Sequence, residues 1–182
     1  MSFKKTGSGL EKITERLDRL SKMHLLVGIP ADHESRSGEP INNAALGYIH
    51  EMGNPKQGIP ARPFLRPGLR KAKGKMRPHL AQSLRNALLG GDPREGLERA
   101  GMIAASSVKN MFTDNKWPEV SDAAILSRVR RRESPASRKR RLGDKKRFRG
   151  ELAGKAKEYP RPVKPLVDTG QLRNSITYVV EE

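Results

Sequence analysis

Apolar residues recur every three or four positions in four stretches of the chain. This spacing is typical of helices with one buried face, and it predicts helices at 8–23, 41–52, 68–89 and 93–112. Two shorter stretches, 24–29 and 175–181, are rich in β-branched and apolar residues and are predicted to be strands. The expected fold is therefore α+β, with a small antiparallel or mixed sheet packed against three to four helices.

Local signals refine the ends of these helices. Ser8 and Glu11 are typical of a capping box at the first helix. Asp92 followed by Pro93 and Glu95 predicts the start of the fourth. Pro78 lies inside the third, where a proline removes one backbone hydrogen bond, so we expect a kink or break near Arg77.

Residues 58–67 contain three prolines and predict a stiff, extended connector. Proline fixes φ and lacks an N–H, which disfavours a regular helix or a central strand. Such a connector would hold Phe64 and Leu65 in one place. We expect both side chains to be buried, either in the domain or against another subunit.

The positive charge of the chain is concentrated in one segment. The 182 residues carry a formal charge of +17, and residues 128–164 hold sixteen Lys/Arg against four acidic residues, a net +12 that leaves +5 elsewhere. This segment has few apolar residues, so it resembles an insertion more than a core element. The predicted core domain is 1–112 plus 165–182, and 113–164 is a basic, partly extended insertion.

The basic insertion allows three interpretations. It could contact nucleic-acid phosphates, become ordered on an acidic protein surface, or be a solvated insertion without a partner. No helix-turn-helix, zinc finger or aromatic RNA-binding pattern is present, which argues against sequence-specific recognition. The candidate contacts to DNA or to an acidic partner are Arg130, Arg131, Arg132, Arg138, Lys139, Arg140, Arg141, Lys145, Lys146 and Arg147.

The sequence offers no constellation for catalysis, metal binding or a cofactor. There is no cysteine, and the four histidines (His24, His33, His50 and His79) lack the spacing of metal ligands. Asp168-Thr169-Gly170 resembles the aspartic-protease triplet, but too few residues follow it to complete such a fold, so Asp168 and Gln171 are predicted to cap a short helix. Apolar runs are too short for a membrane span or a signal peptide.

Three pieces in order carry a family resemblance: Asn43–Gly53 (NAALGYIHEMG), Ile59–Pro67 (IPARPFLRP) and Pro165–Ile176 (PLVDTGQLRNSI). Together they resemble the tail-completion and virion-morphogenesis proteins of tailed bacteriophages, the group similar to minor tail protein Z. Trp117-Pro118 resembles the central Trp-Pro segment of that group. The likeness spans most of residues 8–182, and Pro60–Phe64 is its most specific part.

The resemblance implies a structural virion protein without enzymatic activity. It would act at the head–tail junction or tail end as a homo-oligomeric, six-fold ring around the DNA. It would be assembled in the bacterial cytoplasm. Its partners would be neck, tail-terminator or tail-tube proteins and packaged DNA, but no membrane. The subunit-interface candidates are Arg62, Pro63, Phe64, Leu65 and Arg66. The alternative is a free basic nucleic-acid-binding protein.

Overall fold

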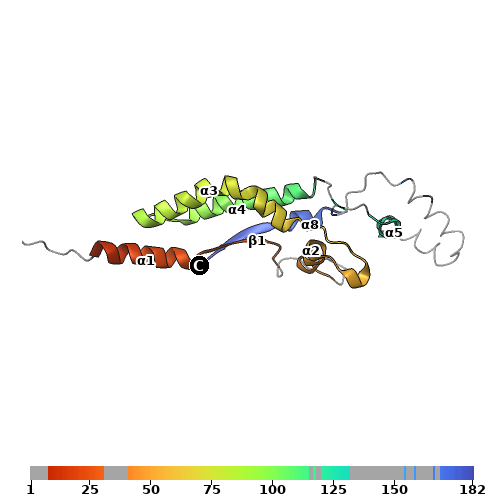
Figure 1. Ribbon diagram of the computed structural model, residues 1–182, viewed down its shortest axis with the longest axis horizontal. Helices are drawn as coiled ribbons and strands as arrows, with labels where there is room; N and C mark the ends of the chain where they lie inside the picture. The colour runs from red at the N-terminus through yellow and green to blue at the C-terminus, as the bar shows by residue number, and fades with distance from the viewer. Residues whose placement is uncertain are drawn as a thin grey trace, which may run out of the picture.

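A long helical hairpin and a two-stranded sheet form the centre of the structure (Figure 1). The computed structural model describes residues 8–30, 41–114, 117, 120–131, 154, 158, 166 and 169–182. The elements in chain order are α1 (Ser8–Lys22), β1 (His24–Gly28), α2 (Asn43–Met52), the 3-10 helix η1 (Pro55–Gln57), α3 (Leu65–Leu89), α4 (Arg94–Met111), α5 (Asp122–Arg131), α8 (Gln171–Asn174) and β2 (Thr177–Glu181). This order confirms the predicted α+β fold.

The two predicted strands pair with each other. β1 and β2 run antiparallel, with Leu26 opposite Val179 in the register. Leu25 and Tyr178 lie on the face that α4 covers. Leu26 and Val179 lie on the other face and are about half exposed. The sheet therefore buries one face only, as the alternation along both strands indicates.

Small residues let the two long helices and the sheet approach closely. α3 contributes Ala72 and Ala87 to its contact with α4, which contributes Ala100 and Ala104, and all four are buried. Gly101 of α4 lies against the sheet, where an added Cβ would overlap the Tyr178 ring and come within 2.9 Å of Leu25 Cδ1. The small residues of α4 therefore permit its close packing against both α3 and the sheet.

The main apolar core lies at the end of the hairpin that carries the start of α3 and the end of α4. Its largest members are Phe64 and Phe112, whose ring centroids are 4.8 Å apart in a tilted arrangement. Leu172 of α8 and Ile176, just before β2, are buried in the same cluster. The core thus joins residues from the middle and the end of the chain, which holds the C-terminal elements against the hairpin.

The structure differs from two expectations about the third helix: it is not broken near Arg77, and it begins before residue 68. The kink, which was the other expected outcome near Arg77, stays a prediction. α3 continues without a break through Pro78, which, like Gly74 four residues earlier, is exposed, so that water can hydrate the carbonyl that the proline leaves unpaired. α3 also begins at Leu65, inside the segment predicted to be extended. Pro67 is tolerated there because the first turn of a helix has no internal partner for its N–H groups.

Part of the predicted insertion is helical. α5 forms a small second cluster in which Val120, Ile125 and Val129 are buried. Trp117 instead packs against the main core. The segment predicted to be a partly extended insertion therefore contains a helix at 122–131, whose apolar residues follow helical spacing. Residues 132–153 lie outside the described residues.

Candidate assembly site

Glu51 links the first two pieces of the family resemblance. Its carboxylate accepts the backbone N–H groups of Phe64 and Leu65 on Oε2, at 2.7 and 2.8 Å, and that of Arg66 on Oε1, at 3.1 Å. These are N–H groups at the start of α3, which have no partner within the helix. Glu51, from the first motif, is therefore the N-terminal cap of α3, which begins in the second motif. A negative charge is favoured at that end of a helix.

The chain between these motifs folds into a closed turn. Asn54 and Ile59 exchange backbone hydrogen bonds, and the N–H of Arg62 donates to the carbonyl of His50 at 2.7 Å. Gly53 stands where the turn begins, with φ of +78°, and an added Cβ would lie 2.8 Å from the backbone nitrogen of Ala61. Only glycine fits both the left-handed backbone and this close approach. His50 and Glu51 are thus parts of a structural turn.

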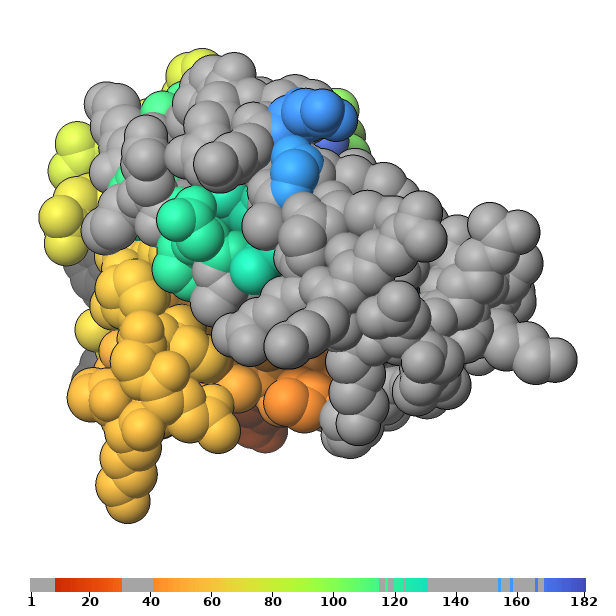
Figure 2. Space-filling view, turned by 90° about the vertical axis from the view of Figure 1, so that its right-hand side faces the viewer, coloured from red at the N-terminus to blue at the C-terminus, as the bar shows by residue number. Residues whose placement is uncertain are grey.

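Arg62 is buried beside another arginine. Its side chain is 8% exposed, that of Arg128 in α5 is 7% exposed, and the Arg62 Nε has no hydrogen-bond partner. The pKa of the Arg62 guanidinium is lowered below its usual value, mainly by burial and secondly by the positive charge of Arg128. Figure 2 views this end of the molecule, with α2 and its following turn in orange and yellow and α5 in teal. Arg62 therefore lies inside the subunit.

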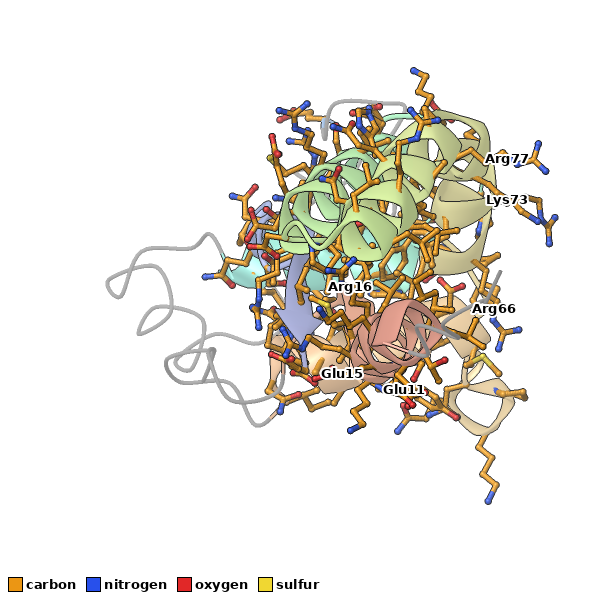
Figure 3. The ribbon with its side chains drawn as sticks, turned by 90° about the vertical axis from the view of Figure 1, so that its left-hand side faces the viewer. Glu11, Glu15, Arg16, Arg66, Lys73 and Arg77 are labelled. Atoms are coloured by element: carbon orange, nitrogen blue, oxygen red, sulfur yellow. The ribbon has the colours of Figure 1, made fainter. Side chains whose placement is uncertain are left out.

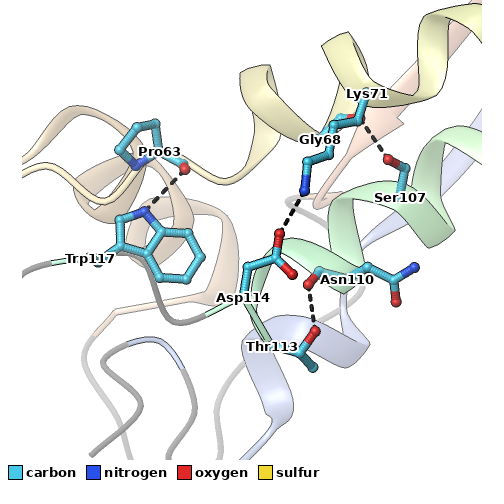
Figure 4. Close-up of polar contacts among 8 residues, drawn as sticks. All are labelled: Pro63, Gly68, Lys71, Ser107, Asn110, Thr113, Asp114 and Trp117. Atoms are coloured by element: carbon cyan, nitrogen blue, oxygen red, sulfur yellow. Dashed lines mark hydrogen bonds and ion pairs between the residues drawn. The ribbon is translucent and has the colours of Figure 1, made fainter.

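The neighbours of Arg62 in the proline motif divide between the core and the surface. Phe64 is buried, as expected, whereas Leu65 is only partly buried and packs against the core. The Pro63 carbonyl accepts the indole N–H of Trp117 at 3.3 Å (Figure 4). Arg66 is exposed. Of the five interface candidates, Arg66 is the one whose side chain is exposed on the subunit surface.

A second polar contact near Trp117 fixes the end of α4 to α3. Lys71 of α3 donates to the carboxylate of Asp114 at 2.6 Å, and the Ser107 hydroxyl donates to the carbonyl of Gly68 at 2.8 Å (Figure 4). These bonds lie beside the buried Phe64 and Phe112. The hairpin is thus held at this end by polar contacts as well as by the core.

Most candidates for contact with DNA or an acidic partner are not described. Arg130 is exposed at the end of α5, and Arg131 is the last residue of that helix. Arg132, Arg138, Lys139, Arg140, Arg141, Lys145, Lys146 and Arg147 lie outside the described residues. Their role stays a prediction.

The predicted cap before α8 is only partly visible. Gln171 begins α8, and its N–H donates to the Thr169 hydroxyl at 3.4 Å, while Asp168 lies outside the described residues. Within the described part of the chain, no three histidine or acidic side chains cluster in a way that could hold a metal ion. Over the same residues, no helix is both long and apolar enough to cross a membrane.

The structure reveals a basic surface that the sequence analysis missed. α3 has seven Lys/Arg and no acidic residue. Four of them, Arg66, Arg70, Lys73 and Arg77, are spaced at i, i+4, i+7 and i+11 and are all exposed; we name these four the basic stripe. Figure 3 shows Arg66, Lys73 and Arg77 pointing to the same side, away from the body of the molecule. Helical spacing combined with the lack of acids from 52 to 91 is the signal that could have found them.

The outer side of α1 holds three acidic residues, although the helix as a whole has four basic residues and a net charge of +1. Glu11, Glu15 and Asp18 are exposed at i, i+4 and i+7, and we name them the acidic stripe. In Figure 3, Glu11 points away from the hairpin and Arg16 points toward it, while Glu15 lies at the edge of the groove between α1 and the hairpin tip. Arg16 donates to the carbonyl of Leu88 at 2.8 Å. α1 is therefore held to the tip of the hairpin by its inner side, and its outer side is open.

Apolar side chains accompany these charges. Leu10 of α1 is 75% exposed, and Leu84 of α3 is 44% exposed. Between α1 and the hairpin tip lies a groove of about 470 Å³, lined in part by Arg16, Leu20 and Ala87. α1 thus leaves uncovered apolar area on its own helix and on α3, as is common at surfaces that contact other proteins.

Comparison with known proteins gives no relative for this chain. No protein-family model matches it, and no curated protein and no solved structure matches it.

Proposed function

We propose that this chain is a structural subunit of a tailed-bacteriophage neck or tail end, where it completes the tail and joins it to the head as part of an oligomeric ring around the DNA channel. The observation that carries the proposal is the union of the two motifs by Glu51. Its carboxylate caps the helix that begins in the proline motif. The residues of the family resemblance therefore serve architecture, which is what an assembly protein requires.

The surface supports the same proposal. α1 and α3 expose stripes of opposite charge together with leucines, on elements that project from the main core. A subunit that works only in an assembly has such surfaces because its neighbours cover them. The net charge of +17 suits a ring through which DNA passes, since non-specific attraction to phosphates needs no base contacts.

The alternative is a free basic nucleic-acid-binding protein, and the basic stripe is the observation that favours it. A row of Lys/Arg along one helix can follow a phosphate backbone. The acidic stripe on α1 is a surface that this alternative does not use, because carboxylates do not bind phosphates.

The experiment is deletion of the gene from the phage or prophage that carries it. The proposal predicts that filled heads and tails lacking their head-proximal end remain separate in the deletion mutant. The gene supplied in trans should restore joining, and the chain should be present in purified wild-type particles. A deletion mutant with normal yield of joined, infectious particles would contradict it. A free nucleic-acid-binding protein would instead be missing from particles and would shift DNA of any sequence at physiological salt.

A further inference from the structure

We infer that the acidic stripe of α1 (Glu11, Glu15, Asp18) docks on the basic stripe of α3 (Arg66, Arg70, Lys73, Arg77) of a second copy of this chain. This inference rests on the proposed function and names the contact from which the ring is built. Both stripes are described, exposed surfaces of the same subunit. The acidic stripe of one copy would therefore bind the basic stripe of the next copy.

The two stripes match in spacing. Each places charges at i, i+4 and i+7 along one side of a helix, whereas the i+11 position is a cation on both helices, Lys22 on α1 and Arg77 on α3, and lies outside the matched spacing. Successive charges on such a side are about 4.5–6 Å apart along the axis. Two helices that lie side by side can therefore set three carboxylates opposite three cations without bending either helix.

The stripes cannot satisfy each other within one subunit. α1 reaches α3 at its far end, where Arg16 donates to the carbonyl of Leu88. Arg77, the nearest member of the basic stripe, is eleven residues before Leu88, which is about 16 Å along the helix. Glu11, on the outer side of α1, points away from the hairpin in Figure 3, and Glu15 lies at the edge of the groove beside the hairpin tip, far from the basic stripe. Among the described residues, no member of either stripe takes part in an ion pair.

The geometry favours a head-to-tail contact between copies. The two surfaces lie on different helices, so each copy can offer one stripe to each of two neighbours, and such head-to-tail contacts form a ring when the rotation between copies closes. α3 would then contact the α1 of its own subunit near Leu88 and the α1 of the neighbouring copy along Arg70 to Arg77. Exposed Leu80 and Leu84 lie between these positions on the same side of α3, where a second helix would cover them.

Charge reversal and exchange test the contact with purified full-length chains. One variant carries Glu11→Lys, Glu15→Lys and Asp18→Lys. The other carries Arg70→Glu, Lys73→Glu and Arg77→Glu, and it leaves Arg66 intact because the N–H of Arg66 is bonded to Glu51. Each variant alone would face like charge with like charge. We expect the concentration for half assembly to rise about 100-fold for each, and assembly of the wild type to weaken with salt.

Mixing gives the decisive readout. An equimolar mixture of the two variants can alternate around a ring, so that each reversed stripe meets its complement, and assembly should return to near the wild-type concentration. A single chain with all six reversals should assemble as well. Lys75→Glu with Arg85→Glu on α3, and Glu98→Lys on α4, are matched controls on exposed positions outside the stripes and should leave assembly unchanged.

The other outcomes are equally informative. If the wild type assembles and both triple variants assemble like it, the contact is wrong while the ring proposal stands. If the α3 variant loses binding to double-stranded DNA but assembles normally, the basic stripe is a DNA surface, which also overturns the inference. If the wild type is monomeric at every concentration, the inference and the proposed ring both fail.

Discussion

The carboxylate of Glu51 accepts the backbone N–H of Phe64 at 2.7 Å, across thirteen residues of sequence. This bond fixes the residue that anchors the main core to the end of α2. It also sets the start of α3, since the same carboxylate takes the next two N–H groups. The turn from α2 to α3 therefore depends on one side chain, that of Glu51.

Removing that side chain should destabilise the subunit. Glu51→Ala leaves three N–H groups at the start of α3 without their acceptor, and we expect the free energy of unfolding to fall by about 1–3 kcal/mol. For a chain of this size, the midpoint of thermal unfolding should drop by several degrees. Circular dichroism during heating measures it, with Glu98→Ala as the control on an exposed part of α4. Equal midpoints for the two variants would contradict the cap.

Phe64 should be essential for folding and hence for assembly. Its side chain is 2% exposed and packs on Phe112, and truncation of a buried Phe costs about 3–5 kcal/mol. Phe64→Ala should therefore give little folded protein and no rings. Tyr48→Ala is the matched control, since Tyr48 is 69% exposed. Rings of Phe64→Ala at normal yield would show that the proline motif is not an anchor.

Two glycines in helix interiors should respond to alanine in opposite ways. Gly101→Ala adds a Cβ against Tyr178 and Leu25, and this overpacking should cost about 1–3 kcal/mol despite the better helix propensity of alanine. Gly74→Ala adds a Cβ in open space on α3 and should stabilise by about 0.5–1 kcal/mol. Urea unfolding compares them. A stabilising Gly101→Ala would contradict the close contact of α4 with the sheet.

Replacing Arg62 should cost little. Its lowered pKa means that the protonated guanidinium is less favourable in the folded subunit than in the unfolded chain. The shift therefore opposes folding at every pH below the lowered pKa. This opposition is relieved only as the pH rises through that pKa. Arg62→Met removes the charge and keeps much of the volume, and at pH 7 the unfolding free energy should be unchanged or higher by up to about 2 kcal/mol. Arg66→Met, at an exposed position, is the control. A loss above about 2 kcal/mol for Arg62→Met alone would contradict this.

Patterns local in sequence predicted much of the fold. The helical periodicities and the two apolar strands are where the spacing placed them, because each buries one face against the hairpin. The start of α3 was missed because its cap comes from Glu51, far upstream, whereas capping rules look for an acceptor next to the helix. The break expected at Pro78 was wrong because helix packing on both sides of it outweighs one lost hydrogen bond.

The candidate site was harder to predict. The basic surface was predicted in 128–164, where the charge is densest, and not in α3. The basic residues of α3 form a surface only when they are placed on one side of a helix. Arg62 looked like a boundary residue because arginines are commonly exposed, but the approach of α5 buries it. Both errors concern where elements distant in sequence meet, which a pattern along the chain does not contain.

Native mass spectrometry of the purified wild-type chain, free of nucleic acid, tests the central claim most directly. The account predicts a closed oligomer of one fixed copy number, six from the family resemblance, in equilibrium with the monomer and shifted toward the monomer as salt rises. A chain that stays monomeric or dimeric at every protein concentration and salt would contradict it.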